Sequence, residues 1–299
     1  MFIWITGLVL VVFMIATGLP IAFSMLIVGF LGLVTLIGLD PTLAMIGQIF
    51  FDNGMNYTLS ILPLFLLMGN FVVRAGLADE LYNAANAWLR HKKGGLAMAT
   101  IIACGGFSSV CGSSLATAAT MAKIALPSMK KYNYPDSLAT GSIAAGGTLG
   151  ILIPPSMILV LYGIITSQDI GQLFLAGIIP GLLGILGYII AVKISVSINK
   201  KSFKTQSALP LIDKINSLKG VFGIISLFFL VMGGIYSGVF TATEAAGVGA
   251  FGSLIIVLIK RKITLNSFNE TLIETAKVTS MLFFLLFGAI LFSNFINLA

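Results

Sequence analysis

FSSVCGSSLATAAT at residues 107–120 and GGTLGILIPPS at residues 146–156 are the most informative stretches of this sequence. Both stretches lie inside strongly apolar sequence, where glycine, serine, threonine and a double proline disfavour an unbroken helix. A lipid bilayer tolerates irregular backbone only where that backbone is buried in protein or lines a cavity. Two such interruptions in one chain therefore predict a binding site built from unwound helices, a construction typical of secondary transporters.

The composition is that of an integral membrane protein. Hydrophobic residues make up 58% of the 299 residues, charged residues make up 9%, and the mean hydropathy is +1.07. A soluble domain carries about 25% charged residues. Apolar runs long enough to approach or exceed a helical span recur from end to end, and the sequence lacks the alternating strands of an outer-membrane barrel. These features predict an all-α fold with several membrane spans.

The net charge of +7 is unevenly distributed. The Lys and Arg residues fall in four clusters, at residues 74–93, 123–131, 193–219 and 260–277. The segments 40–57, 166–172 and 237–245 contain none. This asymmetry follows the positive-inside rule, so the clusters are placed in the cytoplasm, and nucleic-acid binding is the weaker interpretation of the charge. The apolar N-terminus has no basic region or cleavage site and is interpreted as a retained span that starts in the periplasm.

The four clusters determine the expected path of the chain. Residues 94–122 begin and end at cytoplasmic clusters but are fewer than the roughly 40 residues that two spans need. They are predicted to form a re-entrant helical hairpin with its tip near Ser108–Ser114. Residues 137–165 are predicted to cross outward and to break at Pro154-Pro155, since neither proline has an N–H to donate. Further spans are expected at 2–17, 20–38, 57–73, 173–192, 220–236, 246–259 and 278–296, with a loop at 74–93.

Two parts of the chain resemble each other. LFLLMG at residues 64–69 is similar to FFLLFG at residues 283–288, and the spans before each also correspond. With an external N-terminus the corresponding spans run in opposite directions, as in an inverted repeat. We therefore expect three parts: residues 1–199 as the first repeat, with hairpin 94–122 and broken helix 137–165, residues 200–219 as a cytoplasmic linker, and residues 220–299 as the start of the second repeat. On this register the chain is interpreted as truncated and is expected not to transport by itself.

The predicted site has oxygen atoms but no ionisable side chain. Residues 104–122 and 137–168 contain no Asp, Glu, Lys, Arg or His. Hydroxyls and free carbonyls suit a hard cation, whereas the N-termini of half-helices attract an anion. This chemistry indicates sodium as a coupling ion together with an anionic solute. The hydroxyls available there are those of Ser108, Ser109, Ser113, Ser114, Thr117, Thr148 and Ser156.

These motifs carry a family resemblance. CGSSLAT at residues 111–117, GGTLGILIPPS at residues 146–156 and FTATEA beginning at Phe240 closely resemble the large membrane subunit, the DctM-like permease, of tripartite ATP-independent periplasmic (TRAP) transporters. The resemblance implies a sodium-driven elevator carrier of the bacterial inner membrane that imports organic anions, often carboxylates or sugar acids. It also implies two partners, a small four-helix membrane subunit and a periplasmic substrate-binding protein.

The resemblance also assigns the site residues. It implies a sodium site formed by Ser108, Cys111, Gly150, Ile153 and Pro155, largely through backbone carbonyls. The substrate is assigned to the hydroxyl-bearing residues Ser113, Ser114, Thr117 and Ser156. Cys111 stands where the family commonly has serine, and Ala242 replaces a usual proline. Family members continue with a second hairpin that holds a second sodium site, and this hairpin is not in the sequence.

Several other features have alternative interpretations. Glu244 follows Thr241 and Thr243 at an expected helix start, so a capping role is favoured over that of an intramembrane carboxylate. Gly177–Gly181 and Gly184–Gly187 are interpreted as small residues for close helix packing. The only histidine, His91, lies beside basic residues at the membrane surface and is poorly placed to activate a serine, so we expect no enzyme. A passive channel and a non-transporting membrane scaffold remain as alternatives.

Overall fold

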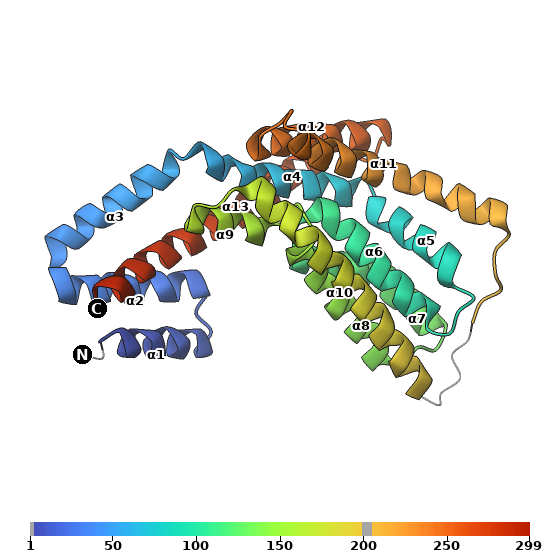
Figure 1. Cartoon of the computed structure of the whole chain (residues 1–299), viewed down its shortest axis with the longest axis horizontal. Coiled ribbons are helices and arrows are strands. Elements are labelled where there is room, and N and C mark those ends of the chain that lie inside the picture. Colours follow the sequence, from blue (N-terminus) through green and yellow to red (C-terminus); the bar gives the residue numbers. More distant parts are fainter. Residues whose placement is uncertain (1–2, 199–204) are drawn as a thin grey trace. The chain divides into compact units, whose positions relative to one another are not determined.

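The computed structural model describes residues 3–198 and 205–299, which form helices and no strand (Figure 1). The predicted all-α membrane fold is thereby confirmed. Within these ranges, five helical segments are long and apolar enough to cross a bilayer, and four shorter apolar helices accompany them. The chain divides into two compact units, Met1–Ser60 with Ile273–Ala299, and Ile61–Leu272.

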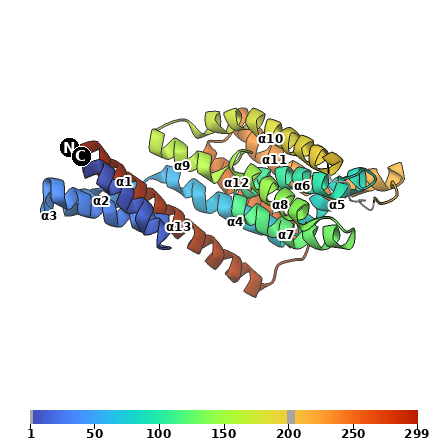
Figure 2. The ribbon, with the colours of Figure 1, turned by 90° about the horizontal axis from the view of Figure 1, so that it is seen from below.

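The first unit joins the two ends of the chain. It contains α1 (Ile3–Ala16), α2 (Ile21–Ile37), α3 (Leu39–Gly54), the 3-10 turn η1 (Tyr57–Ser60) and the C-terminal part of α13 (Leu265–Leu298). Figure 2 shows α1, α2 and this part of α13 side by side. A Cβ atom on Gly29 of α2 would lie 2.9 Å from the backbone nitrogen of Phe292, so glycine lets the two helices approach closely. The ring of Phe295, 1% exposed, fills the space beside Gly7 and Gly32.

The second unit is built around a central buried helix. Its helices are α4 (Ile61–Arg74), α5 (Leu77–Leu89), α6 (Gly95–Cys111), α7 (Ser114–Lys131), α8 (Asp136–Thr148), the 3-10 turn η2 (Leu149–Ile151), α9 (Met157–Thr166), α10 (Ile170–Ile198), α11 (Leu211–Tyr236) and α12 (Ala242–Ile259). Helix α6 contacts α4, α5, α7, α8, α10 and α11. Cys104 and Phe107 on α6 are fully buried, and both cysteines of the chain are free thiols. Cys111 at the end of α6 is buried as well.

Two helix pairs are each connected through a glycine with positive φ. Gly18 joins α1 to α2 with φ of 94°, and Gly238 joins α11 to α12 with φ of 73°. Glycine adopts this left-handed region without the steric cost that a side chain brings. Helix α12 then packs on α4, where a Cβ atom on Gly249 would lie 2.6 Å from Met68 Sδ. The parallel with α2 and α13 agrees with the predicted repeat, which stays a prediction.

Two segments expected to be irregular are partly helical. The predicted loop 74–93 contains α5, because Leu77, Leu81 and Ala84 follow a helical period and are buried. The predicted linker 200–219 includes residues 200–204, which lie outside the described ranges, and the first turns of α11, which begins at Leu211. Helix α5 supplies a surface for these turns, since the Lys214 Nζ lies 5.9 Å from the ring centre of Trp88.

The start of α12 carries the expected cap. The Glu244 backbone N–H donates to Thr241 Oγ1 over 3.3 Å, and the Thr241 backbone N–H donates to Glu244 Oε2 over 2.8 Å. These reciprocal bonds form a capping box that satisfies two backbone donors at the helix start. The interpretation of Glu244 as a capping residue is confirmed.

A crossing of two broken helices as the candidate site

Helices α6 and α7 meet in a tip of two residues. The Gly112 backbone N–H donates to the Ser108 carbonyl over 3.1 Å, which closes α6, and Gly112 itself adopts the left-handed region with φ of 61°. Ser113 is extended, and its Oγ accepts from the Ala116 N–H over 3.4 Å to cap the start of α7. Gly112 thus ends the hydrogen bonding of α6, Ser113 caps α7, and these two residues alone connect the two helices.

Helix α8 is broken before α9 begins. After Thr148 the chain makes the 3-10 turn η2, and α9 starts only at Met157. Pro154 and Pro155 have no N–H, so the carbonyls of Gly150 and Ile151 lack the donor four residues ahead that a continuous helix would provide. The Ser156 hydroxyl partly compensates, because it donates to the Ile151 carbonyl over 2.9 Å and accepts from the Leu159 N–H over 3.5 Å.

The hairpin tip lies directly on this break. The Met157 N–H donates to the Gly112 carbonyl over 3.4 Å. A Cβ atom on Gly112 would lie 2.6 Å from the Pro155 carbonyl oxygen, and one on Gly150 would lie 2.9 Å from the Ser114 nitrogen. No side chain fits at either position without a shift of the backbone. The two interruptions that the sequence predicted are therefore in contact, backbone against backbone.

The crossing brings complementary helix ends together. Helices α7 and α9 both begin there, each capped by a serine in extended conformation, Ser113 and Ser156. The first turn of a helix presents unpaired N–H groups and a partial positive charge that favours an anion. Helix α6 ends at the same place with Cys111, and a last turn presents carbonyls, which favour a cation. The arrangement can hold ions of both signs.

Several oxygen atoms at the crossing have no protein donor. The Met157 N–H, which would serve the Ile153 carbonyl in a continuous helix, donates to Gly112 instead. Across the described residues, no N–H outside the regular helical pattern donates to the carbonyls of Ile153 or Pro155. The hydroxyls of Ser108 and Thr117 are buried; that of Thr117 lies next to the Cys111 thiol, and that of Ser108 has no hydrogen-bond partner among the described residues. Buried oxygens normally find partners, so these are free to coordinate a cation.

The donor set consists of oxygen atoms alone. Over residues 3–198 and 205–299, no group of three or more His, Cys, Asp and Glu side chains could hold a metal ion. Zinc and other transition metals use such nitrogen and sulfur ligands, and calcium sites usually include carboxylates. Neutral hydroxyl and carbonyl oxygens fit a monovalent hard cation better, and sodium is such a cation.

All the residues predicted for the site come from the crossing or its adjoining turns. Ser108 and Cys111 lie in the last turn of α6, and Ser113, Ser114 and Thr117 lie at the tip and in the first turn of α7. Gly150 lies in η2, Ile153 and Pro155 in the unwound segment, and Ser156 at the cap of α9.

The hydroxyls of Ser113 and Ser156 are already engaged as helix caps. The sequence analysis did not predict a role for Gly69 of α4, which packs against Cys111 at the hairpin tip. A Cβ atom on Gly69 would lie 3.0 Å from the Cys111 carbonyl oxygen. The only sequence signal for Gly69 is that it corresponds to Gly288 in the two similar segments 64–69 and 283–288.

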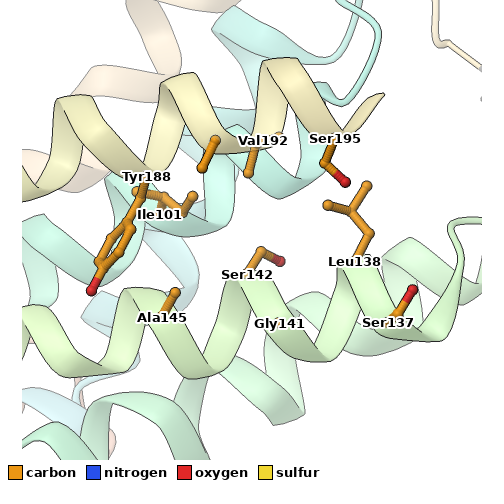
Figure 3. Close-up of a pocket in the computed structure, with 10 residues that line it drawn as sticks. Ile101, Ser137, Leu138, Gly141, Ser142, Ala145, Tyr188, Val192 and Ser195 are labelled. Carbon is orange, nitrogen blue, oxygen red and sulfur yellow. The ribbon is translucent and has the colours of Figure 1, made fainter. Parts of the chain in front are cut away.

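A separate pocket of about 270 Å³ lies between α8 and α10 (Figure 3). Its polar lining comes from Ser137, Ser142, Ser195 and Tyr188, and none of the predicted site residues lines it. Tyr188 points from α10 toward α8, and its hydroxyl lies 2.8 Å from Thr148 Oγ1. The pocket thus ends beside the last residue of α8, just before the chain unwinds.

Comparison with known families agrees with this geometry. The sequence profile described as "Tripartite ATP-independent periplasmic transporter, DctM component" matches residues 8–299. The chain belongs to this family. It is accordingly a multi-pass protein of a membrane transport family and not of an enzyme family.

Named relatives cover most of the chain. The C4-dicarboxylate TRAP transporter large permease protein DctM of Pseudomonas aeruginosa is 38% identical over 245 residues, which are 82% of this chain and 57% of that protein. The DctM protein of Vibrio cholerae is 34% identical over 96% of this chain and 67% of its own length. The sialic acid TRAP transporter large permease protein SiaM of the same organism is 35% identical over 92% of this chain and 64% of its own length. The chain thus spans about three fifths to two thirds of these relatives.

Proposed function

We propose that the chain is the membrane permease subunit of a sodium-coupled secondary transporter that imports organic anions. The observation that carries this proposal is the contact between the hairpin tip and the broken helix, where free oxygens and two helix N-termini meet. Relatives named for C4-dicarboxylates, sialic acid and 2,3-diketo-L-gulonate support carboxylates or sugar acids as the substrate class.

The sodium ion is assigned to the oxygens of Ser108, Cys111, Gly150, Ile153 and Pro155. The carbonyls of Gly150, Ile153 and Pro155 support this assignment because each has lost its helical donor. Pro154 has no N–H for Gly150, the Met157 N–H donates to Gly112 instead of Ile153, and the Leu159 N–H donates to Ser156 Oγ instead of Pro155. The buried Ser108 hydroxyl adds an oxygen without a partner among the described residues. Cys111 contributes through its carbonyl, since a thiol is a weak ligand for a hard cation.

The substrate carboxylate is assigned to the N-termini of α7 and α9, next to Ser113, Ser114, Thr117 and Ser156. A carboxylate at a helix start accepts hydrogen bonds from backbone N–H groups and interacts favourably with the helix dipole. Sodium bound at the carbonyls supplies the counter-charge close by. Binding of each ion then increases the affinity for the other, which is the coupling that a symporter needs.

Membership of the family supports a proposal for the partners and the location. The permease operates with a small four-helix membrane subunit and with a periplasmic binding protein that delivers the anion. It resides in the bacterial inner membrane with a periplasmic N-terminus, because the basic clusters then lie in the cytoplasm. Movement of the site-bearing unit through the membrane as an elevator completes the transport cycle.

Uptake by cells tests the proposal on the protein as it is naturally made. We would replace Ser156 by Ala on the chromosome of the native host and follow the uptake of labelled C4-dicarboxylates and sialic acid with and without external sodium. Concentrative uptake that requires sodium in the parent strain and declines in the variant is expected. Uptake that persists after the sodium gradient is abolished and never exceeds the external concentration would indicate a channel instead.

A further inference from the structure

Three glycines on one face of α10 contact the unwound segment. Gly177, Gly181 and Gly184 are spaced by four and three residues, which places them on one side of the helix. A Cβ atom on Gly177 would lie 2.6 Å from the Leu152 carbonyl oxygen, and one on Gly181 would lie 2.7 Å from Ile153 Cγ1. A Cβ atom on Gly184 would lie 3.0 Å from Leu149 Cδ2.

These contacts differ from ordinary close packing between two helices. Leu152 and Ile153 are not helical, since they follow η2 and precede the two prolines. The backbone of α10 at Gly177 therefore lies directly against the peptide group that joins Leu152 to Ile153. Gly187, on the same helix, has no atom within 4 Å of its Cβ position, so small residues on α10 are not all packed in this way.

A hydrogen bond fixes the same segment at its start. The Thr148 hydroxyl donates to the Ala145 carbonyl over 2.7 Å, so Tyr188 is the donor in the 2.8 Å bond between the Tyr188 and Thr148 hydroxyls. Figure 3 shows Tyr188 reaching from α10 toward α8. Helix α10 thus holds the last residue of α8 through Tyr188 and the following residues through its glycines.

We propose that Gly177, Gly181 and Tyr188 are positioning residues that set the sodium affinity by fixing the unwound segment against α10. This inference rests on the proposed sodium site and extends it to a helix that contributes no ligand. The Leu152–Ile153 peptide group is continuous with the Ile153 carbonyl, which is assigned to the ion. A methyl group on Gly177 would press on backbone atoms that cannot rotate away, so it would displace the neighbouring carbonyl.

The predicted effect is on ion binding more than on folding. A functional site has to be held within about 0.5 Å of its working geometry by the residues that support its ligands. Losing a residue that orients a metal ligand typically costs about 10-fold to 100-fold in affinity. Gly181 faces the flexible side chain of Ile153, so its substitution should have the smaller effect.

Thermal unfolding of the purified chain, with sodium chloride exchanged for choline chloride at constant ionic strength, tests the inference. We would compare the wild-type chain, Gly177→Ala, Gly181→Ala, Tyr188→Phe and the matched control Gly187→Ala. The expected result is a sodium-dependent rise of Tm in the wild type. Its half-maximal sodium concentration should be unchanged in Gly187→Ala and should increase about tenfold or more in Gly177→Ala. In choline, the Tm of Gly177→Ala should stay close to that of the wild type.

The outcomes separate the two proposals. A wild-type chain whose Tm does not respond to sodium would overturn the sodium site, and this inference with it. If the wild type responds to sodium and Gly177→Ala has the same half-maximal sodium concentration, the positioning role is overturned and the sodium site is not. If Gly177→Ala does not fold, Tyr188→Phe decides, because it removes one hydroxyl and keeps the ring. An unchanged half-maximal sodium concentration in that variant would then refute the positioning role, and an increase of about threefold would support it.

Discussion

The Met157 N–H and the Gly112 carbonyl form a 3.4 Å hydrogen bond that joins the start of α9 to the hairpin tip. Neither group has a partner in its own helix, because Gly112 directly follows α6 and Met157 is the first residue of α9. The bond therefore satisfies one unpaired group of each helix end with the other.

Replacement of Gly112 by Ala should weaken this contact. Gly112 has φ of 61°, and a residue with a side chain pays about 1–2 kcal/mol for the left-handed conformation. Its new Cβ would also meet the Pro155 carbonyl. We expect a lower Tm and a lost sodium response in thermal unfolding. Gly141→Ala is the control, since nothing lies within 4 Å of that Cβ position on α8, and an equal loss in this variant would contradict the explanation.

Both ends of the α6–α7 hairpin should face the cytoplasm. Lys93 precedes α6, Lys130 lies near the end of α7, and both side chains are exposed. Cysteines introduced as Lys93→Cys and Lys130→Cys, each in a chain with Cys104→Ala and Cys111→Ala, should react with a membrane-impermeant maleimide only when the cytoplasmic face is accessible. Labelling of the two positions from opposite faces would show that the segment crosses the membrane.

The double variant Pro154→Ala, Pro155→Ala should bind sodium less well. Alanine supplies the N–H groups that the prolines lack, so the carbonyls of Gly150 and Ile151 can regain helical partners. The helix becomes continuous, and the proposed ligand carbonyls accept helical hydrogen bonds instead of binding sodium. Sodium-dependent uptake in the native host should fall, and the half-maximal sodium concentration should rise. Unchanged sodium dependence would remove the unwound carbonyls from the ligand set.

The capping box at α12 should contribute measurably to stability. Replacing Thr241 by Ala removes the hydroxyl that accepts from the Glu244 N–H, which should cost about 1 kcal/mol in the free energy of unfolding. Thr241→Ser keeps the hydroxyl and serves as the control. A Tm equally reduced in both variants would point to packing of the methyl group rather than to capping.

The sequence predicted the interruptions well because their cause is local. Proline lacks an N–H wherever it stands, and Gly112 followed by Ser113 forms a turn and a cap from neighbouring residues alone. The contact between Gly112 and Pro155 joins segments far apart in the chain, and no local pattern specifies it. The predicted loop at 74–93 was wrong over α5, because its basic residues were interpreted as markers of topology and the helical period of Leu77 and Leu81 was overlooked.

The glycines of α10 illustrate another limit. Spacing such as that of Gly177 and Gly181 indicates that something approaches the helix closely, and this is correct. The spacing does not show whether the neighbour is another helix or a non-helical segment such as Leu152–Ile153. The difference matters, because only the second makes these glycines part of the support of a binding site.

The partnership of α2 with α13 has a consequence for how the protein is made. Helices α1 and α2 are synthesised before the surface of Leu291, Phe292 and Phe295 on which they pack, because more than 200 residues separate the two parts of the chain. Translation proceeds at about 5–20 residues per second, so the interval between them is on the order of ten seconds or more. During that time Gly7, Gly29 and Gly32 lack the contacts that Phe292 and Phe295 later provide. Biogenesis of the protein therefore requires that α1 and α2 wait for the C-terminal part of α13.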